Sequence, residues 1–274
     1  MDGPGSRLVI FFQGCNFQCS TCHNPYTIGE CDHCGDCVAD CPSGALSQDA
    51  NGWVEWNSAD CTQCDQCLDI CPISASPKTA SYSTAQLIRI IHDNRSFISG
   101  ITLSGGEATV QLPFIVELLE TLKADPELSS LNCLLDTNGM LDEHGWNQLL
   151  PYLDGVMLDL KAWNNDRHRV LTGAGNSEVL QSLALLASAG KLLELRLLVI
   201  PEQTDFEENV DALAQLLGDL PVESVIRINA FQQHGVRGEA RQWPGATRIE
   251  VECFANQLQD AGVSNLVLPA IWQG

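Results

Sequence analysis

Three cysteines near the start of the chain have a spacing that suits an iron–sulfur cluster with one open iron. Cys15, Cys19 and Cys22 follow the pattern C-x3-C-x2-C, which supplies three thiolate ligands. A [4Fe–4S] cube held by three thiolates leaves one of its four irons free for a substrate. A cube held by four thiolates is a closed electron carrier. The spacing therefore predicts a cluster at which a small molecule can bind to iron.

A second stretch contains two copies of a different cysteine run. The pattern C-x2-C-x2-C-x3-C-P occupies residues 31–42 and occurs again at residues 61–72. In bacterial ferredoxins with two clusters, the fourth cysteine of such a run ligates the other cluster. The repeat therefore predicts two closed cubes, one held by Cys31, Cys34, Cys37 and Cys71, and the other by Cys61, Cys64, Cys67 and Cys41.

Two questions about this stretch stay open at the level of sequence. Pairs of cysteines spaced C-x2-C also suit tetrahedral zinc, although two complete four-cysteine runs before a proline favour clusters. Residues 31–76 are rich in Cys, Asp and Gln and show little helical periodicity. We therefore expect an insertion that is stabilised by metal binding. Its clusters either carry electrons toward the open cube or have a purely structural role.

Composition excludes several classes of partner and compartment. Lys and Arg total 14 against 35 Asp and Glu, and the formal net charge is −21, so we expect no nucleic-acid partner. There is no apolar run of about 18 residues and no leader resembling a signal peptide, so we expect no membrane association. Eleven of the 13 cysteines belong to the three metal-ligand runs. This use of cysteine predicts a reducing, cytoplasmic setting.

The rest of the chain alternates between strand-like and helix-like stretches. Apolar runs that predict strands lie at residues 8–13, 101–103, 133–136, 155–160, 193–200 and 225–230, and helical periodicity predicts helices at 84–94, 112–124, 178–190, 206–217 and 249–261. This alternation indicates a parallel sheet with crossover helices. We predict an α/β fold, a partial (β/α)6 barrel with a ferredoxin-like insertion, divided into residues 1–30, 31–76 and 77–274.

Charged residues on two predicted strands indicate a polar interior. Asp159 and Lys161 alternate with leucines, so they share one face of their strand. A strand covered by helices on both sides would be apolar on both faces. The charges therefore line either a ligand pocket or an internal ion pair. Arg196 on the next strand likewise either lines a ligand pocket or forms an internal ion pair, for which Glu194 is the candidate partner.

The cysteine loop, followed by the turn Ser104-Gly105-Gly106-Glu107 after a strand, resembles the radical SAM superfamily. Six further motifs resemble its glycyl-radical-enzyme activating enzymes: DGPGSR at 2–7, FQGC at 12–15, CHNP at 22–25, DTNG at 136–139, MLDLK at 157–161 and HRVLTG at 168–173. The resemblance covers nearly the whole chain. It is closest to the YjjW branch, which carries the same double-cluster insertion.

The resemblance implies three [4Fe–4S] clusters and S-adenosylmethionine (SAM) chelated at the open iron. It implies that reductive cleavage of SAM gives a 5′-deoxyadenosyl radical, which removes a Cα hydrogen from a glycine of a partner glycyl radical enzyme. A flavodoxin or a ferredoxin-type protein is the implied reductant. Two alternatives stay open: a radical SAM enzyme acting on a small molecule or another peptide, and a non-enzymatic iron–sulfur electron carrier.

The resemblance also assigns roles to individual residues. Those expected to contact the SAM amino group are Gly105, Gly106 and Glu107. Positions that hold a monovalent cation beside the SAM carboxylate match Asp136, Thr137 and Met157. Further residues of the cofactor pocket are Asp159, Lys161 and Arg196, and Lys161 joins the three loop cysteines as a candidate catalytic residue. The motif that lies against the substrate glycine loop matches Asp2 and Arg7.

Several positions depart from the family pattern. Thr21 stands where superfamily members usually place an aromatic residue before the third cysteine. Gln232 occupies the position of a pocket histidine in relatives, with His234 two residues later. Cys133 and Cys253 fall outside every cluster run, and we expect both to be buried free thiols.

Overall fold

The protein is built on one large parallel β-sheet. The structure, a computed structural model, describes residues 3–270, so Asp2, one of the two predicted peptide-binding residues, lies outside the described residues. Seven strands follow one another in the order β1-β4-β5-β6-β7-β8-β9, with β1 and β9 at the edges. Their bounds are β1 Arg7–Phe12, β4 Gly100–Gly105, β5 Asn132–Thr137, β6 Gly155–Leu160, β7 Leu192–Val199, β8 Val225–Ala230 and β9 Leu266–Val267.

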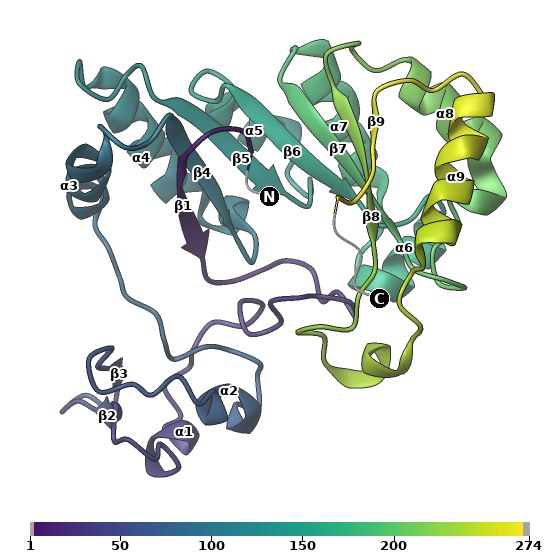
Figure 1. Cartoon of the computed structure of the whole chain (residues 1–274). Helices are drawn as coiled ribbons and strands as arrows, with labels where there is room; N and C mark the ends of the chain where they lie inside the picture. The colour runs from purple at the N-terminus through teal and green to yellow at the C-terminus, as the bar shows by residue number, and fades with distance from the viewer. Residues whose placement is uncertain (1–2, 271–274) are drawn as a thin grey trace.

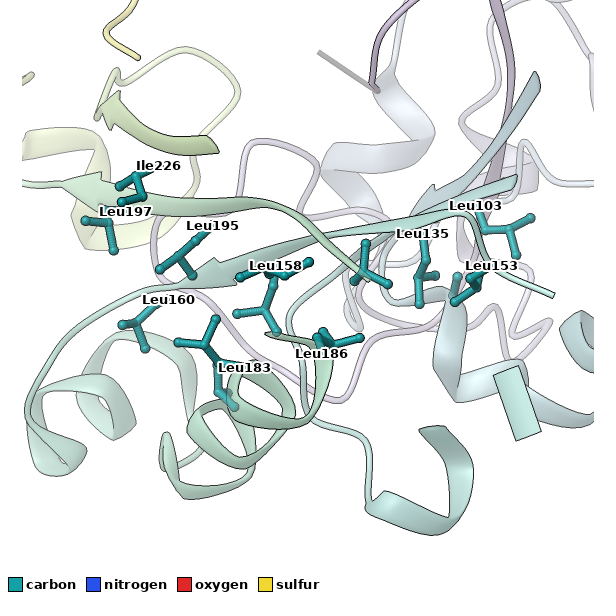
Figure 2. Packing of buried hydrophobic residues seen from close by; sticks show 14 of the residues in the cluster. Leu103, Leu135, Leu153, Leu158, Leu160, Leu183, Leu186, Leu195, Leu197 and Ile226 are labelled. Atoms are coloured by element: carbon teal, nitrogen blue, oxygen red, sulfur yellow. The ribbon is translucent and has the colours of Figure 1, made fainter. Parts of the chain in front are cut away.

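The longer helices cover one face of this sheet (Figure 1). They are α3 Thr84–Asn94, α4 Leu112–Ala124, α5 Glu143–Leu149, α6 Asn165–Thr172, α7 Ser177–Ser188, α8 Val210–Gly218 and α9 Arg248–Asp260. Figure 2 shows Leu158 and Leu195 of neighbouring strands packed toward Leu183 and Leu186 of α7. Burial of these aliphatic side chains against the helices is the main stabilising contribution to the α/β unit.

The alternation seen in the sequence predicted this architecture well. Helices α3 and α4 and strands β6 and β8 have the predicted bounds, and the remaining predicted elements are displaced by one to four residues at an end. The sequence prediction missed α5, α6 and the two-residue strand β9. Helix α6 is strongly polar (NDRHRVLT), so its short apolar stripe gives little periodic signal. The sheet consequently has seven strands where six were predicted.

Residues 31–76 form a small lobe beside the sheet (Figure 1). It contains the short helices α1 Asp36–Ala39 and α2 Gln66–Ile70 and an antiparallel hairpin of β2 Leu46–Gln48 and β3 Val54–Trp56. Its small buried core consists of Cys37, Leu46, Cys67 and Leu68. Isolated bridges join Ala75 at its end to Thr27 and Gly29 of the loop after β1. The lobe is therefore docked directly next to the first cysteine loop.

Two cysteines outside the metal-ligand runs differ in environment. Cys133 on β5 is buried, as predicted, but Cys253 on α9 is exposed, so that part of the prediction is wrong. Helix α9 directs Val251 and Phe254 into the core, which leaves residue 253 on its outer side. In residues 3–270, no helix is both long and apolar enough to cross a membrane.

Candidate functional site

Cys15, Cys19 and Cys22 lie in the loop after β1, at the carboxyl end of the sheet. The N–H of Cys15 donates to the carbonyl of Ile28 at 3.0 Å. On the other side of the loop, the N–H of Gln18 donates to the carbonyl of Thr172 at the end of α6, at 2.7 Å. Backbone hydrogen bonds therefore fix the cysteine loop from two directions.

The glycines of the Ser104–Glu107 turn hold this loop against β4. A Cβ atom on Gly105 would lie 2.2 Å from the backbone nitrogen of Phe12, and Gly105 has φ of +119°. A Cβ on Gly106 would lie 2.3 Å from the carbonyl oxygen of Gly14. The N–H groups of Gly106 and Glu107 donate to the carbonyls of Phe12 and Gly14, at 2.9 and 2.8 Å. Both glycines are thus required for the close approach of β4 to the cysteine loop.

Glu107 points into the protein and joins the turn to the end of β5. It is 1% exposed. One carboxylate oxygen accepts from Thr109 (Oγ1, 2.7 Å) and Thr137 (Oγ1, 2.9 Å), and the other accepts from the N–H of Asn138 at 2.8 Å. Burial raises the pKa of Glu107, although these donors oppose the shift. The structure therefore gives Glu107 a positioning role between β4 and β5.

The sheet face opposite the helices is polar at the carboxyl ends of β5, β6 and β7. In β6 and β7, Leu158 and Leu195 point toward α7 (Figure 2), and Met157 and Glu194 alternate with them. These two residues are in register, and so are Asp159 and Arg196. The predicted polar interior is therefore present, and it lies on the face left uncovered by the helices.

Arg196 is the centre of an ion-pair network on this face. Its guanidinium donates to Asp136 at 2.8 Å and to Glu194 at 2.6 Å, and Nη2 lies 3.1 Å from Sδ of Met157. Arg227 of β8 adds a second bond to Glu194 at 2.8 Å. Burial would raise the pKa of Glu194, but the two arginines hold it below its usual range. Burial raises the pKa of Asp136, against the opposing effect of Arg196.

A second ion pair lies at the carboxyl end of β6. Lys161 donates to Asp159 at 2.7 Å, and both side chains are about three-quarters buried, with 23% and 24% exposed. Burial opposes both charges, but Asp159 raises the pKa of Lys161, and Lys161 lowers that of Asp159. Both groups are thus charged near neutral pH. Lys161 also acts electrostatically on Cys19, so the pair lies next to the cysteine loop.

Burial keeps the three loop cysteines in the thiol form. Burial raises the pKa of Cys15 to about 11 and that of Cys19 to about 12, and it also raises that of Cys22. Metal ligands must be thiolates, so a cluster bound here displaces three protons. In the part of the chain that the structure describes, no three His, Cys, Asp or Glu side chains converge as ligands of a single metal ion would.

One predicted ligand set of the small lobe surrounds a pocket. Cys41, Cys61, Cys64 and Cys67 all line the same space. The indole N–H of Trp56, in the same wall, is the main cause that lowers the pKa of Cys61. Four thiols that face one cavity provide the donors that a [4Fe–4S] cube requires.

The two cysteine runs repeat one backbone conformation. His33 (φ 60°) corresponds to Gln63 (φ 57°), and Gly35 (φ 87°) corresponds to Asp65 (φ 60°), at the same positions relative to the cysteines. Left-handed conformations cost free energy for residues other than glycine and are concentrated at functional sites. In the second run, the N–H of Ala75 donates to Sγ of Cys71 at 3.3 Å.

Arg7, predicted to contact a substrate peptide, is bonded to its own sheet. Its guanidinium donates to Thr102 Oγ1 at 2.7 Å, to the carbonyl of Asn132 at 3.0 Å and to that of Ile101. Arg7 opens β1, so these bonds fasten the edge strand to β4 and β5 at the amino end of the sheet.

Sequence reasoning did not identify several residues that support the site. Asn138 donates to Asn16 at 2.7 Å and lies 3.9 Å from Sγ of Cys15. His168 of α6 is fully buried, donates through Nδ1 to the carbonyl of Ala174 at 2.8 Å, and packs edge-on against Phe17. The DTNG and HRVLTG motifs contained both residues, but their positions beside the cysteine loop depend on the tertiary fold.

Comparison with known proteins identifies the class. Residues 9–216 match the family model of the radical SAM superfamily. The fold also resembles that of SuiB of Streptococcus suis bound to its precursor peptide, with a TM-score of 0.60, 12% identity and coverage of 98% of this chain and 50% of that one. The cysteine loop and the parallel sheet are thus those of a radical SAM protein.

Sequence relatives define the group within this class. The chain is 32% identical to the choline trimethylamine-lyase activating enzyme of Oleidesulfovibrio alaskensis, over 79% of this chain and 74% of the relative. It is 29% identical to the pyruvate formate-lyase-activating enzyme of Streptococcus mutans, over 85% and 73%. The 4-hydroxyphenylacetate decarboxylase activating enzyme of Clostridioides difficile is 26% identical, over 88% and 80%. The chain belongs to the glycyl-radical-enzyme activating enzymes of the radical SAM superfamily.

Proposed function

We propose that this chain activates a partner glycyl radical enzyme by removing one hydrogen atom from a glycine Cα. The observation that carries the proposal is the three-cysteine loop fixed beside a polar sheet face that the helices of residues 3–270 leave uncovered (Figure 1). Cys15, Cys19 and Cys22 would hold a [4Fe–4S] cluster there, and this cluster would supply the one electron needed for cleavage of SAM to methionine and the 5′-deoxyadenosyl radical that takes the hydrogen. The chain itself holds and orients the reactants.

Different residues around the loop would bind the cluster and SAM. Cys15, Cys19 and Cys22 would hold the cluster, and the remaining iron would be open to SAM. Residues of the adjacent turn and sheet face would bind SAM. They are Gly105, Gly106 and Glu107 of the turn, and the side chains of Asp136, Thr137, Met157, Asp159, Lys161 and Arg196. Asp136, Thr137 and Met157 would also hold a monovalent cation. The position of Asp159, Lys161 and Arg196 on the uncovered sheet face, with Lys161 next to Cys19, supports this assignment.

The small lobe would contribute two more clusters, for three in total. Its first cube would be held by Cys31, Cys34, Cys37 and Cys71, and its second by Cys41, Cys61, Cys64 and Cys67. The pocket lined by the second set and the repeated backbone of the two runs support this proposal. The chain would then consist of residues 1–30, the ferredoxin-like insertion 31–76, and the remainder 77–274.

Docking of the lobe next to the cysteine loop supports a relay of electrons. The bridges from Ala75 to Thr27 and Gly29 bring the first cube's ligand Cys71 close to the loop. A flavodoxin or ferredoxin-type protein would be the electron donor. Because all three clusters need reduced thiols, we propose a cytoplasmic location.

The partner's glycine would enter from the uncovered sheet face. Glycine has no side chain to obstruct the approach of the radical, and its Cα radical is delocalised over the flanking amides. Asp2 and Arg7 would lie against the segment that carries this glycine. The net charge of −21 gives no support for a nucleic-acid partner.

An anaerobic assay tests the activity. Purified chain, SAM and a strong reductant are combined with a choline lyase, a pyruvate formate-lyase or a 4-hydroxyphenylacetate decarboxylase of the glycyl radical class. We expect SAM cleavage and an organic-radical doublet on one of these proteins. Cleavage stimulated by small molecules alone would show a different substrate class.

Iron content and two variants test the cluster assignment. Three cubes predict about twelve irons per chain, whereas a carrier with two closed clusters predicts about eight. Cys19→Ala should abolish SAM cleavage. Cys64→Ala should retain part of it when a small, strong reductant replaces the protein donor. Complete inactivity of a folded Cys64 variant under those conditions would rule out a role limited to electron relay.

A further inference from the structure

The indole of Trp56 has a buried donor that forms no standard hydrogen bond. Trp56 ends β3 and is in register with Leu46 across the hairpin. Its ring packs against the small core of the lobe. Within residues 3–270, its Nε1 atom is buried and makes no hydrogen bond of standard geometry, although the thiol of Cys61 lies beside it. Unsatisfied buried N–H groups are rare because they lose their bonds to water, so this donor calls for a specific explanation.

The space in front of this donor is lined by sulfur. Trp56 and the four thiols of Cys41, Cys61, Cys64 and Cys67 line the same pocket. Thiolate and cluster sulfurs accept hydrogen bonds and carry negative charge. A cube bound through Cys61 would thus give the indole a negatively charged sulfur as acceptor, in place of a weakly accepting thiol.

A buried cation lies in the same wall. Lys78 lines the pocket, and its side chain is 13% exposed. Nζ donates to Asp65 at 2.5 Å and to Gln63 at 3.3 Å, both in the loop between cysteine ligands. The ammonium is therefore held beside the cysteines by two contacts.

We propose that Trp56 sets the reduction potential of the cluster held by Cys41, Cys61, Cys64 and Cys67, by donating its indole N–H to a sulfur of that site. This inference rests on the proposed function, in which the lobe binds two clusters. Reduction adds one negative charge, so a donor and a nearby cation stabilise the reduced form and raise the potential. Lys78 acts in the same direction. Trp56 is a positioning residue that acts through the cluster sulfur.

The test measures the midpoint reduction potentials of the lobe clusters in protein that has its clusters bound. Trp56→Phe keeps the aromatic ring and removes the N–H. In anaerobic redox titrations followed by electron paramagnetic resonance, we expect one lobe cluster to become about tenfold harder to reduce, which corresponds to about 59 mV for one electron. Lys78→Gln should lower the same potential. The matched control is Trp53→Phe in the same hairpin, whose ring is 60% exposed and stacked on His33, and it should change neither potential.

A second measurement needs no variant at Trp56. Protein labelled with ¹⁵N in the tryptophan indole should show a ¹⁵N coupling to one reduced lobe cluster in pulsed paramagnetic resonance, and Trp53→Phe should retain it. Absence of this coupling, or an unchanged potential in a Trp56→Phe protein with full iron content, overturns the inference. An iron content of only four per wild-type chain would instead show that the lobe holds no clusters, which is failure of the proposed function.

Discussion

Arg196 donates to Asp136 at 2.8 Å and so connects β7 to β5 across the strand between them. The same guanidinium bonds Glu194 at 2.6 Å. One arginine with an 11% exposed side chain therefore compensates two mostly buried carboxylates. This arrangement makes Arg196 the principal counter-charge of the uncovered sheet face.

Removing this arginine should strongly destabilise the protein. Arg196→Ala leaves Asp136 without its cation, and breaking a buried ion pair by removing one partner costs about 3–5 kcal/mol. Urea unfolding of the purified protein measures the loss. The control Arg248→Ala breaks an exposed pair with Glu252 on α9 and should cost less than about 1 kcal/mol. Equal effects of the two variants would contradict the central role of Arg196.

A methyl group at residue 105 should separate the turn from the cysteine loop. In Gly105→Ala the new Cβ would lie 2.2 Å from the nitrogen of Phe12, and φ of +119° is unfavourable for alanine. We expect lower stability and less iron bound at the first cysteine loop, measured by unfolding and by iron analysis. Gly218→Ala, where a Cβ meets nothing within 4 Å, should be neutral or slightly stabilising. Full iron binding and normal stability in Gly105→Ala would show that β4 does not hold the loop.

Arg7 should contribute to stability in the absence of any partner. Arg7→Ala removes bonds to Thr102 and to two backbone carbonyls, and hydrogen bonds from a charged donor are worth about 1.5–3 kcal/mol. The free energy of unfolding of the isolated chain should fall by that amount, whereas the exposed Arg89→Ala should change it by less than about 0.5 kcal/mol. Unchanged stability together with weaker binding of the partner enzyme would instead favour a peptide-binding role.

His168 should make stability depend on pH in the mildly acidic range. Burial lowers the pKa of His168 below its ordinary value of 6.5, so the unfolded chain takes up a proton that the folded chain excludes. Stability is therefore fully present above pH 6.5 and decreases as the pH falls from 6.5 toward the lowered folded-state pKa. His168→Asn can retain the bond to the carbonyl of Ala174 and does not titrate there. We expect denaturant midpoints between pH 7 and 5 to fall less steeply for the variant, and identical slopes would contradict this explanation.

The spacing of residues predicts the ligand chemistry, and it predicted most of the fold correctly. Three-cysteine and four-cysteine runs predict their metal groups because cluster ligands lie close together in the chain. The period of apolar residues likewise predicted the bounds of α3 and β6, because helices and strands are set by local geometry. The polar interior was also visible in the alternation of Asp159 and Lys161 with leucines.

The partners of these residues were decided by the tertiary structure. The pairing of Arg196 with Asp136 depends on the order of strands in the sheet, and the bonds of Glu107 to β5 depend on where the turn lies. The two glycines of the turn, expected to admit a ligand, are needed for contact with the backbone of Phe12 and Gly14. Contacts between residues from 30 to 93 positions apart leave no local pattern, because they arise only when the core brings those strands together.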